Sequence, residues 1–260
     1  MKKEVEKMCL EFEPISLSEM DDVMFMDRIE TKFLMHIDLL PLVLKTIQPK
    51  YKILEIDQLR IFPYSTLYYD TKENSMFQGH HNGKFYRYKV RCRKYVSCDL
   101  SFLEIKEKTT GDRTIKNRVK TDGIETTLSE RSMNYLGQYT PFQNIPLEPK
   151  IYTDFSRITL VSKDMQERAT IDQNVHFLYN GKDHSLYDKL VIVELKRKTF
   201  SCASSTLIKT LRQYGITGGG ISKYCIGRSL LEDDLKSNNF KQDIRTINKI
   251  NDGKYYYFNL

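Results

Sequence analysis

Polar and apolar positions alternate most regularly between Phe85 and Lys108. Successive residues of a β-strand point to opposite faces, so an alternation with a period of two predicts strands. In the first half of this segment one face carries only basic side chains, those of Arg87, Lys89, Arg91 and Arg93. In the second half one face carries Glu104, Lys106 and Lys108, and the other carries Leu103 and Ile105. Turn-forming residues at 97–99 complete a predicted β-hairpin with one apolar face and one charged, mostly basic face.

The Glu-x-Lys pattern of this hairpin recurs in two other β-prone segments, at 30–32 and at 194–196. Each copy places a glutamate and a lysine on the same face of a predicted strand. A solvent-exposed face of the sheet would give the same pattern. If the faces are instead turned toward each other, a dry core is excluded, because burying so many charges side by side would be very unfavourable. Strands that close into a barrel with a wet lumen accommodate them. We therefore expect a lumen in which basic residues bind a polyanion and glutamate binds a divalent cation.

The rest of the chain predicts more strands, a few helices and no linker that would divide it. Strands are expected at residues 27–36, 60–69, 114–119, 150–161, 168–172 and 190–198. Helices are expected at 39–47 after Asp38, at 130–138 after Ser129, and from Ser204 or Ser205 to Gly215, because serine and aspartate cap helix N-termini. Gly79 and Gly83 predict a turn.

The fold class expected from these elements is mainly β (α+β), an antiparallel β-barrel tunnel with flanking helices. One domain is expected over residues 1–260, with its core at about 25–230 and a helical, aromatic appendage at 231–260.

Composition narrows the class of partner and the compartment. The net charge of +7 favours an anionic partner. The five cysteines are odd in number and form no CxxC pair, which argues against a disulfide framework or a structural zinc site and favours a reducing cytosol. No apolar run approaches the roughly 18 residues that span a bilayer. We therefore expect a soluble, cytoplasmic protein without direct membrane insertion, whose link to a membrane would need a membrane-protein partner.

The usual nucleotide and nucleophile motifs are missing. The run from Gly218 to Ser222 has the spacing of neither a Walker loop nor a dinucleotide fingerprint. No convincing Ser/His or Cys/His triad is visible, and the five histidines are scattered. Phosphoryl transfer needs no side-chain nucleophile, because alignment, charge neutralisation and a metal ion supply most of the catalysis.

Six segments carry a family resemblance. They are Arg91-Cys92-Arg93, Glu104-Ile105-Lys106, Lys116-Asn117-Arg118, the run from Arg168 to Asp172, Glu194-Leu195-Lys196 and the run from Ile221 to Tyr224. In order and approximate spacing they resemble the catalytic domain of the vacuolar transporter chaperone (VTC) family, one of the triphosphate tunnel metalloenzymes. The resemblance extends over about residues 25–230, and it is the ordered set of segments that is specific.

The resemblance implies an antiparallel tunnel and a reaction on triphosphate that depends on Mn²⁺ or Mg²⁺. VTC-type members are similar to polyphosphate polymerases, which transfer the γ-phosphoryl group of ATP to a growing chain. The residues that it implies for catalysis are Arg91, Arg93, Lys106, Arg157, Arg168 and Lys196. For phosphate binding it implies Lys32, Lys116, Arg118, Ser222 and Lys223, and for the metal Glu194. Glu30 and Glu104 are expected to pair with neighbouring basic groups instead.

The chain departs from the family pattern, and two other functions stay open. Phe155 stands where the family often has tyrosine, and Gly220 stands where it often has a basic residue. The same tunnel could hydrolyse tripolyphosphate or a nucleoside triphosphate. The third hypothesis, after polyphosphate synthesis and hydrolysis, is a non-catalytic scaffold that binds a polyanion. This hypothesis predicts basic residues on outward faces, with aromatic rings nearby on which the bases of a nucleic acid could stack. Nucleic acid is nevertheless the less expected partner.

Overall fold

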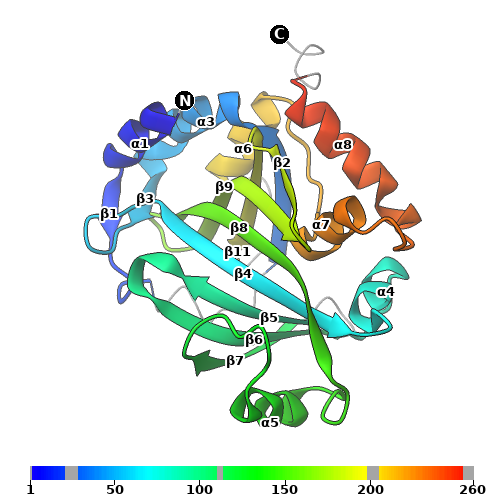
Figure 1. Cartoon of the computed structure of the whole chain (residues 1–260). Helices are drawn as coiled ribbons and strands as arrows, with labels where there is room; N and C mark the ends of the chain where they lie inside the picture. The colour runs from blue at the N-terminus through cyan, green and yellow to red at the C-terminus, as the bar shows by residue number, and fades with distance from the viewer. Residues whose placement is uncertain (1, 21–28, 110–113, 198–204, 254–260) are drawn as a thin grey trace.

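The computed structural model describes residues 2–20, 29–109, 114–197 and 205–253, with only the backbone for 184–187. Eleven strands form one sheet, and its main path runs β2-β11-β9-β8-β4-β5-β6-β7 (Figure 1). On this path the strands are β2 (Ile29–His36), β4 (Phe62–Thr71), β5 (Arg87–Tyr95), β6 (Leu100–Lys108), β7 (Thr114–Thr121), β8 (Leu147–Ser162), β9 (Glu167–Tyr179) and β11 (Leu190–Arg197). Off the path lie β1 (Glu13–Ile15), β3 (Tyr51–Leu54) and β10 (Lys182–Tyr187). Of the pairings described, only β1 with β3 is parallel, so the prediction of a mainly antiparallel β fold is confirmed.

Helices flank the sheet, as expected. The α-helices are α1 (Lys2–Leu10), α3 (Leu40–Ile47), α4 (Ser75–His81), α5 (Glu130–Tyr139), α6 (Thr206–Gln213), α7 (Lys223–Leu231) and α8 (Lys241–Asn251). Short 3-10 turns are η1 (Ile37–Leu39), η2 (Gln48–Lys50), η3 (Val96–Cys98) and η5 (Asn238–Phe240). Across the described part of the chain, no helix has the length and apolar character needed to cross a membrane.

The sheet curves until its two ends face each other. Lys116 on β7 lies within electrostatic range of Lys196 on β11 and Glu30 on β2, although these strands stand at opposite ends of the strand order. Strands β7 and β2 do not pair with each other in the residues that the structure describes. The sheet therefore forms a tunnel-like barrel that is open along one side, between β7 and β2 (Figure 1).

The hydrophobic core lies outside this curved sheet. Apolar residues of β2, β8, β9 and β11, among them Phe33 and Leu195, pack with α1, α3 and α6. On the other side, Val90 and Leu103 of the hairpin pack against Leu136 of α5. Because side chains alternate along a strand, burying one set outward forces the charged set inward.

Helix α7 closes one end of the barrel. Its Tyr224 and Cys225 pack with Leu34 and Ile192, which continue the inner faces of β2 and β11. The contact is close at Gly227, where an added Cβ would lie 2.5 Å from the Phe177 ring and 2.7 Å from the Ile151 side chain. A larger residue at this position would push α7 away from the sheet.

Most predicted elements agree with the structure, and one local prediction, the cap of α3, is wrong. Ser129 and Ser205 cap α5 and α6 as expected, each accepting a hydrogen bond from a backbone N–H. Asp38 does not cap α3, because a 3-10 turn precedes that helix and Leu39 takes the cap position. The turn expected between Gly79 and Gly83 lies at residues 82–83, and Gly79 itself is within α4. The last part of the expected aromatic appendage, residues 254–260, lies outside the described residues.

Candidate functional site

The hairpin and β7 bring rows of basic residues together on the inner face. Lys89 lies directly opposite Lys106, and Lys106 lies opposite Lys116. In the next row Arg91 faces Glu104, and Glu104 faces Arg118. Cross-strand partners are neighbours on one face of a sheet, so the period-two pattern of the sequence becomes a charged surface.

The strands on the far side of the barrel supply a second set of charges. Glu194 on β11 lies between Lys32 on β2 and Thr170 on β9. One row further, Lys196 lies between Glu30 and Arg168. Both glutamate–lysine repeats therefore face the same interior as the hairpin.

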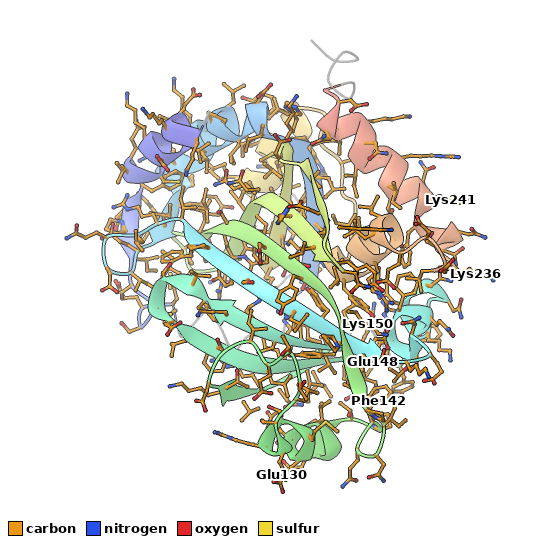
Figure 2. All side chains as sticks on the ribbon, viewed as in Figure 1. Glu130, Phe142, Glu148, Lys150, Lys236 and Lys241 are labelled. Atoms are coloured by element: carbon orange, nitrogen blue, oxygen red, sulfur yellow. The ribbon has the colours of Figure 1, made fainter. Side chains whose placement is uncertain are left out.

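The inner face is defined here as the charged residues that these strands and the start of α7 direct inward. They are Glu30, Lys32, Lys89, Arg91, Arg93, Glu104, Lys106, Lys116, Arg118, Arg157, Arg168, Asp172, Glu194, Lys196 and Lys223. By contrast, Lys236 and Lys241 project from the periphery of the molecule beside α8 (Figure 2).

Arg91 and Glu104 form the central ion pair of the hairpin. The Arg91 Nε donates to Glu104 at 2.7 Å, and the Tyr68 hydroxyl accepts from the same guanidinium at 3.2 Å. Burial alone would raise the pKa of Glu104, but Arg91 and Arg93 outweigh it and hold that pKa well below its usual value. Glu104 is therefore ionised at neutral pH and partners arginine, as the sequence predicted.

Asp172 organises two cations on the opposite wall. Arg157 donates to both of its carboxylate oxygens, at 2.6 and 2.8 Å, and Lys223 from α7 donates to the same carboxylate. Burial opposes ionisation of Asp172, yet Arg157 and Lys223 keep its pKa well below the usual range. A bidentate arginine contact fixes the guanidinium plane, so Arg157 is oriented before any ligand binds.

Glu194 is the carboxylate with the most basic surroundings. Lys196 lies 2.5 Å from it, and Lys32, Lys106 and Arg157 also act on it. Burial would raise its pKa, but these cations lower it well below its usual value. Glu194 therefore stays ionised and presents oxygen to the middle of the inner face.

Six cations of the inner face have no ion pair within the described residues: Lys89, Arg93, Lys106, Lys116, Arg118 and Arg168. Arg93 is only 6% exposed, and its Nε donates to Thr66 at 3.3 Å. The nearby charge of Arg91 is the largest influence on Lys106, and together with burial it lowers the Lys106 pKa well below its usual value. Like charges held together without counter-charge indicate a place for an anion.

Two stacked aromatic rings hold the cations around this place. Tyr64 and Phe155 stack with centroids 5.2 Å apart. The Arg93 and Arg157 guanidinium groups lie 5.2–5.5 Å from both rings, and the Lys223 ammonium lies 4.4 Å from Phe155. Phe155, one of the departures from the family pattern, thus keeps the aromatic support for the cations and lacks only a hydroxyl.

Helix α7 points its N-terminus at the inner face. The Ser222 hydroxyl caps the helix by accepting from the Cys225 N–H at 3.3 Å, and it also accepts from Lys89 at 2.9 Å. A helix N-terminus carries partial positive charge, so it adds to the positive potential of the neighbouring lysines.

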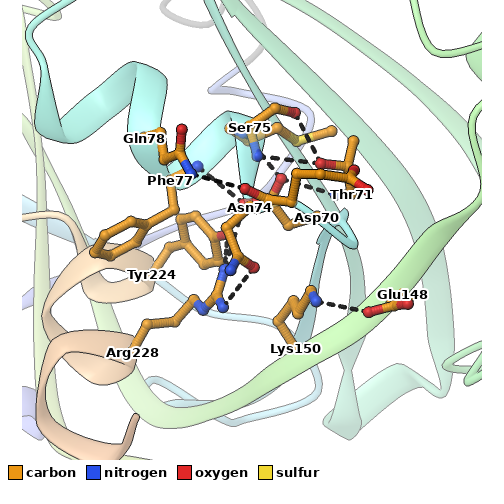
Figure 3. A network of polar contacts seen from close by, with 12 residues as sticks. Asp70, Thr71, Asn74, Ser75, Phe77, Gln78, Glu148, Lys150, Tyr224 and Arg228 are labelled. Carbon is orange, nitrogen blue, oxygen red and sulfur yellow. Dashed lines mark hydrogen bonds and ion pairs between the residues drawn. The ribbon is translucent and has the colours of Figure 1, made fainter. Parts of the chain in front are cut away.

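A buried polar network fixes α7 in position (Figure 3). Asp70 on β4 accepts from the Tyr224 hydroxyl at 2.5 Å and from Arg228 at 3.3 Å, and also from backbone N–H groups of α4. Arg228, 1% exposed, bonds Asn74 at 2.8 Å as well. The network ties α4, α7 and β4 together, so Ser222 and Lys223 are held in place.

A divalent cation fits these donors only if a ligand completes its coordination. Within the described residues no group of three or more His, Cys, Asp or Glu side chains could hold a metal ion. Magnesium and similar hard cations commonly bind one or two carboxylates together with substrate phosphates. Glu194 is suited to be that carboxylate, because it is ionised and lies among basic side chains of the kind that bind phosphate.

The structure brings the predicted residues together on one face. Arg118 sits at its more exposed edge, 4.8 Å over the Phe102 ring. Two contributors were missed: Asp172 and Tyr64. Lys89 was predicted on the basic face of the hairpin but was not among the predicted site residues. Asp172 has the parity of Arg168, so the alternation could have indicated it. Tyr64 gave no such signal.

Comparisons with known proteins agree with this architecture. Residues 27–232 match the family described as VTC domain. No curated protein sequence matches the chain. A candidate adenylyl cyclase from Hippeastrum with a dominant triphosphatase activity has a TM-score of 0.53 and 14% identity, and the similarity covers 81% of this chain and 99% of that one. A candidate adenylate cyclase from Vibrio parahaemolyticus has a TM-score of 0.47 and 11% identity, over 76% and 98% of the two chains. At such identity the Hippeastrum similarity shows the fold alone.

Proposed function

The chain belongs to the VTC domain family, and from this premise we propose that it is a metal-dependent phosphotransferase that adds the γ-phosphoryl group of ATP to polyphosphate. The observation that carries the proposal is the set of inner-face cations without ion pairs in the described residues, among them Arg93, Lys106, Lys116 and Arg168, around the ionised Glu194. Neutralising such a set requires a ligand with several negative charges. A triphosphate joined to a phosphate chain provides them.

The proposed reaction needs little more than alignment. An ionised terminal oxygen of the polyphosphate attacks the γ-phosphorus, and the bond from that phosphorus to the bridging oxygen breaks, so ADP leaves with the electron pair. No side chain has to remove a proton, because the attacking oxygen is already ionised. Arg93 and Lys106 would bind the oxygens on which charge accumulates. Mn²⁺ or Mg²⁺, bound by Glu194 and phosphate oxygens, would neutralise further charge.

Arg157 and Lys223 would act as preoriented phosphate ligands. Both are held by Asp172, so their side chains are ordered before substrate arrives. Ordering in the free protein lowers the entropic cost of binding. The buried positions of Arg91 and Arg93, 9% and 6% exposed, disfavour the scaffold alternative, which needs outward basic residues.

Triphosphatase activity is the second candidate. It is favoured by the dominant triphosphatase activity of the Hippeastrum protein, whose fold is similar. In that reaction water takes the place of the polyphosphate oxygen, and the same cations would bind the triphosphate.

The test is incubation of purified protein with ATP and Mn²⁺, with gel detection of polyphosphate and parallel measurement of ADP and free phosphate. Polymerisation produces long chains and ADP with little free phosphate. Hydrolysis produces free phosphate and no chains. Neither product, together with tight tripolyphosphate binding, would support the non-catalytic scaffold.

A further inference from the structure

A second cluster of cations lies where α4 meets the start of β5. The two elements touch, since a Cβ added at Gly79 of α4 would lie 3.8 Å from the Arg87 Cβ. Arg87 and Lys89 continue the basic face of β5 toward this end. Lys89 also bonds Ser222 of α7 at 2.9 Å, so α4, β5 and α7 converge here.

His80 of α4 lies within this cluster with an unused polar atom. Its Nδ1 is buried and has no hydrogen-bond partner. The ring stacks on Phe240 of η5, with centroids 5.9 Å apart and planes 20° apart. A buried nitrogen without a partner is costly, so it indicates a group that the ligand-free chain does not provide.

The charged groups with the largest influence on His80 are all basic. They are Lys89 and Arg87 from β5, Lys32 from β2 and Lys108 from β6. Burial first, and then these charges, lower the pKa of His80 to about 2. The imidazole is therefore neutral and can carry its one proton on Nδ1. A neutral N–H donor surrounded by cations is suited to bind an anion without adding to the repulsion.

The Arg87 end of this cluster is far from Arg93. From residue 87 to residue 93 the strand rises about 20 Å, at 3.3 Å per residue. A triphosphate has only three phosphorus atoms in line and is shorter than this span. An anion that extends from Arg93 past Lys89 to the Arg87 end of the strand is therefore a longer phosphate chain.

We propose that His80, Arg87, Lys89 and Ser222 form a subsite at the end of the inner face, the His80 subsite, where the His80 Nδ1–H donates to a phosphate of a chain longer than triphosphate. The inference rests on the proposed function, because it assigns part of the polyphosphate to this end. It also gives the neutral imidazole a role that the central cations do not share, namely selecting for chain length.

Three variants test the role of the N–H group. His80→Phe keeps the ring and its contact with Phe240 but removes the donor. His80→Asn places an amide N–H near the position of Nδ1, whereas His80→Gln places one near Nε2. Calorimetry would compare the affinity of each protein for long-chain polyphosphate and for tripolyphosphate.

We expect the ratio of long-chain to tripolyphosphate affinity to fall about tenfold in His80→Phe, the loss typical of one hydrogen bond to a charged group. His80→Asn should restore most of the ratio, and His80→Gln should not. An unchanged ratio in His80→Phe, or recovery by Gln as complete as by Asn, overturns the proposal. Tripolyphosphate binding reports that each variant is folded. If the variants change the affinity ratio as expected but the wild-type protein makes no polyphosphate, the proposed function is wrong and the His80 subsite is still supported.

Discussion

Lys106 on β6 lies directly opposite Lys116 on β7, and neither lysine has a carboxylate partner within the described residues. Like charges in direct cross-strand positions destabilise a sheet. The chain nevertheless holds them there, with Arg91 close enough to be the largest influence on the pKa of Lys106. A ligand that neutralises this pair should bind strongly, and the first predictions concern it.

Removing a single cation of the inner face should weaken the binding of ATP or tripolyphosphate far more than removing a peripheral cation. Arg93→Ala and Lys106→Ala each remove a contact to a charged group, worth about 1.5–3 kcal/mol. Affinity for ATP or tripolyphosphate should therefore fall by roughly ten- to a hundredfold. Lys241→Ala on α8, at the periphery in Figure 2, is the control and should have little effect. Equal, small losses in all three proteins, measured by calorimetry, would contradict the site.

Tripolyphosphate binding should take up a proton at Lys106. The neighbouring cations lower its pKa in the free protein, and a bound anion removes that field and raises it again. Between the two pKa values, binding takes up a proton, so affinity rises as the pH falls through this window. Calorimetry in buffers of different ionisation enthalpy measures the uptake.

The matched control for this proton uptake is Lys106→Arg, which keeps the charge but does not titrate. Tripolyphosphate itself also titrates, and it does so identically with both proteins. Equal proton uptake by Lys106→Arg and wild type would show that another group accounts for it.

Mn²⁺ binding and Mn²⁺-supported turnover should require the carboxylate of Glu194. Glu194→Gln keeps the volume and removes the charge that a hard cation needs. Turnover supported by Mn²⁺ should be lost, and so should Mn²⁺ binding in the presence of tripolyphosphate, while circular dichroism shows that the variant keeps the wild-type fold. Glu148→Gln is the control, since Glu148 is exposed and pairs with Lys150 away from the inner face (Figure 3). Normal Mn²⁺-dependent activity of Glu194→Gln would exclude it as an essential ligand.

Asp172→Asn should destabilise the free protein by about 3–5 kcal/mol, because it leaves Arg157 and Lys223 without their buried counter-charge. The wild-type pKa of Asp172 is depressed, so its contribution is present above the unfolded value near 3.9 and is lost as the pH falls further. Urea unfolding at neutral pH should show the full difference and unfolding at strongly acidic pH a smaller one. Tripolyphosphate should recover part of the loss by replacing the carboxylate. A pH-independent difference would contradict the assignment.

Local rules predicted the hairpin and the charged face from the sequence. The alternation from Arg87 to Arg93 gave the side on which each residue lies, and turn and cap residues such as Ser129 and Ser205 gave boundaries. Alternation specifies a face but not what lies across from it. That Lys116 faces Lys196 follows from the curvature of the whole sheet, which no local pattern contains.

The missed features are those that depend on contacts between distant segments. Asp70 looks like an ordinary turn residue, and its bonds to Tyr224 and Arg228 join positions more than 150 residues apart. Gly79 and Gly83 indicated the turn at 82–83 but not the helix α4 before it, where backbone N–H groups bond to Asp70. His80 looked like a scattered surface histidine for the same reason.

The uncompensated cations of the inner face have a consequence for how stable the free protein can be. Folding brings these charges together, so part of the folding free energy is held as repulsion that a bound anion relieves. Neutralising Arg93 or Lys106 should therefore make the empty protein harder to unfold while it weakens ligand binding. Selection for high phosphate affinity would therefore favour basic residues at these positions, whereas selection for stability of the ligand-free protein would favour neutral ones.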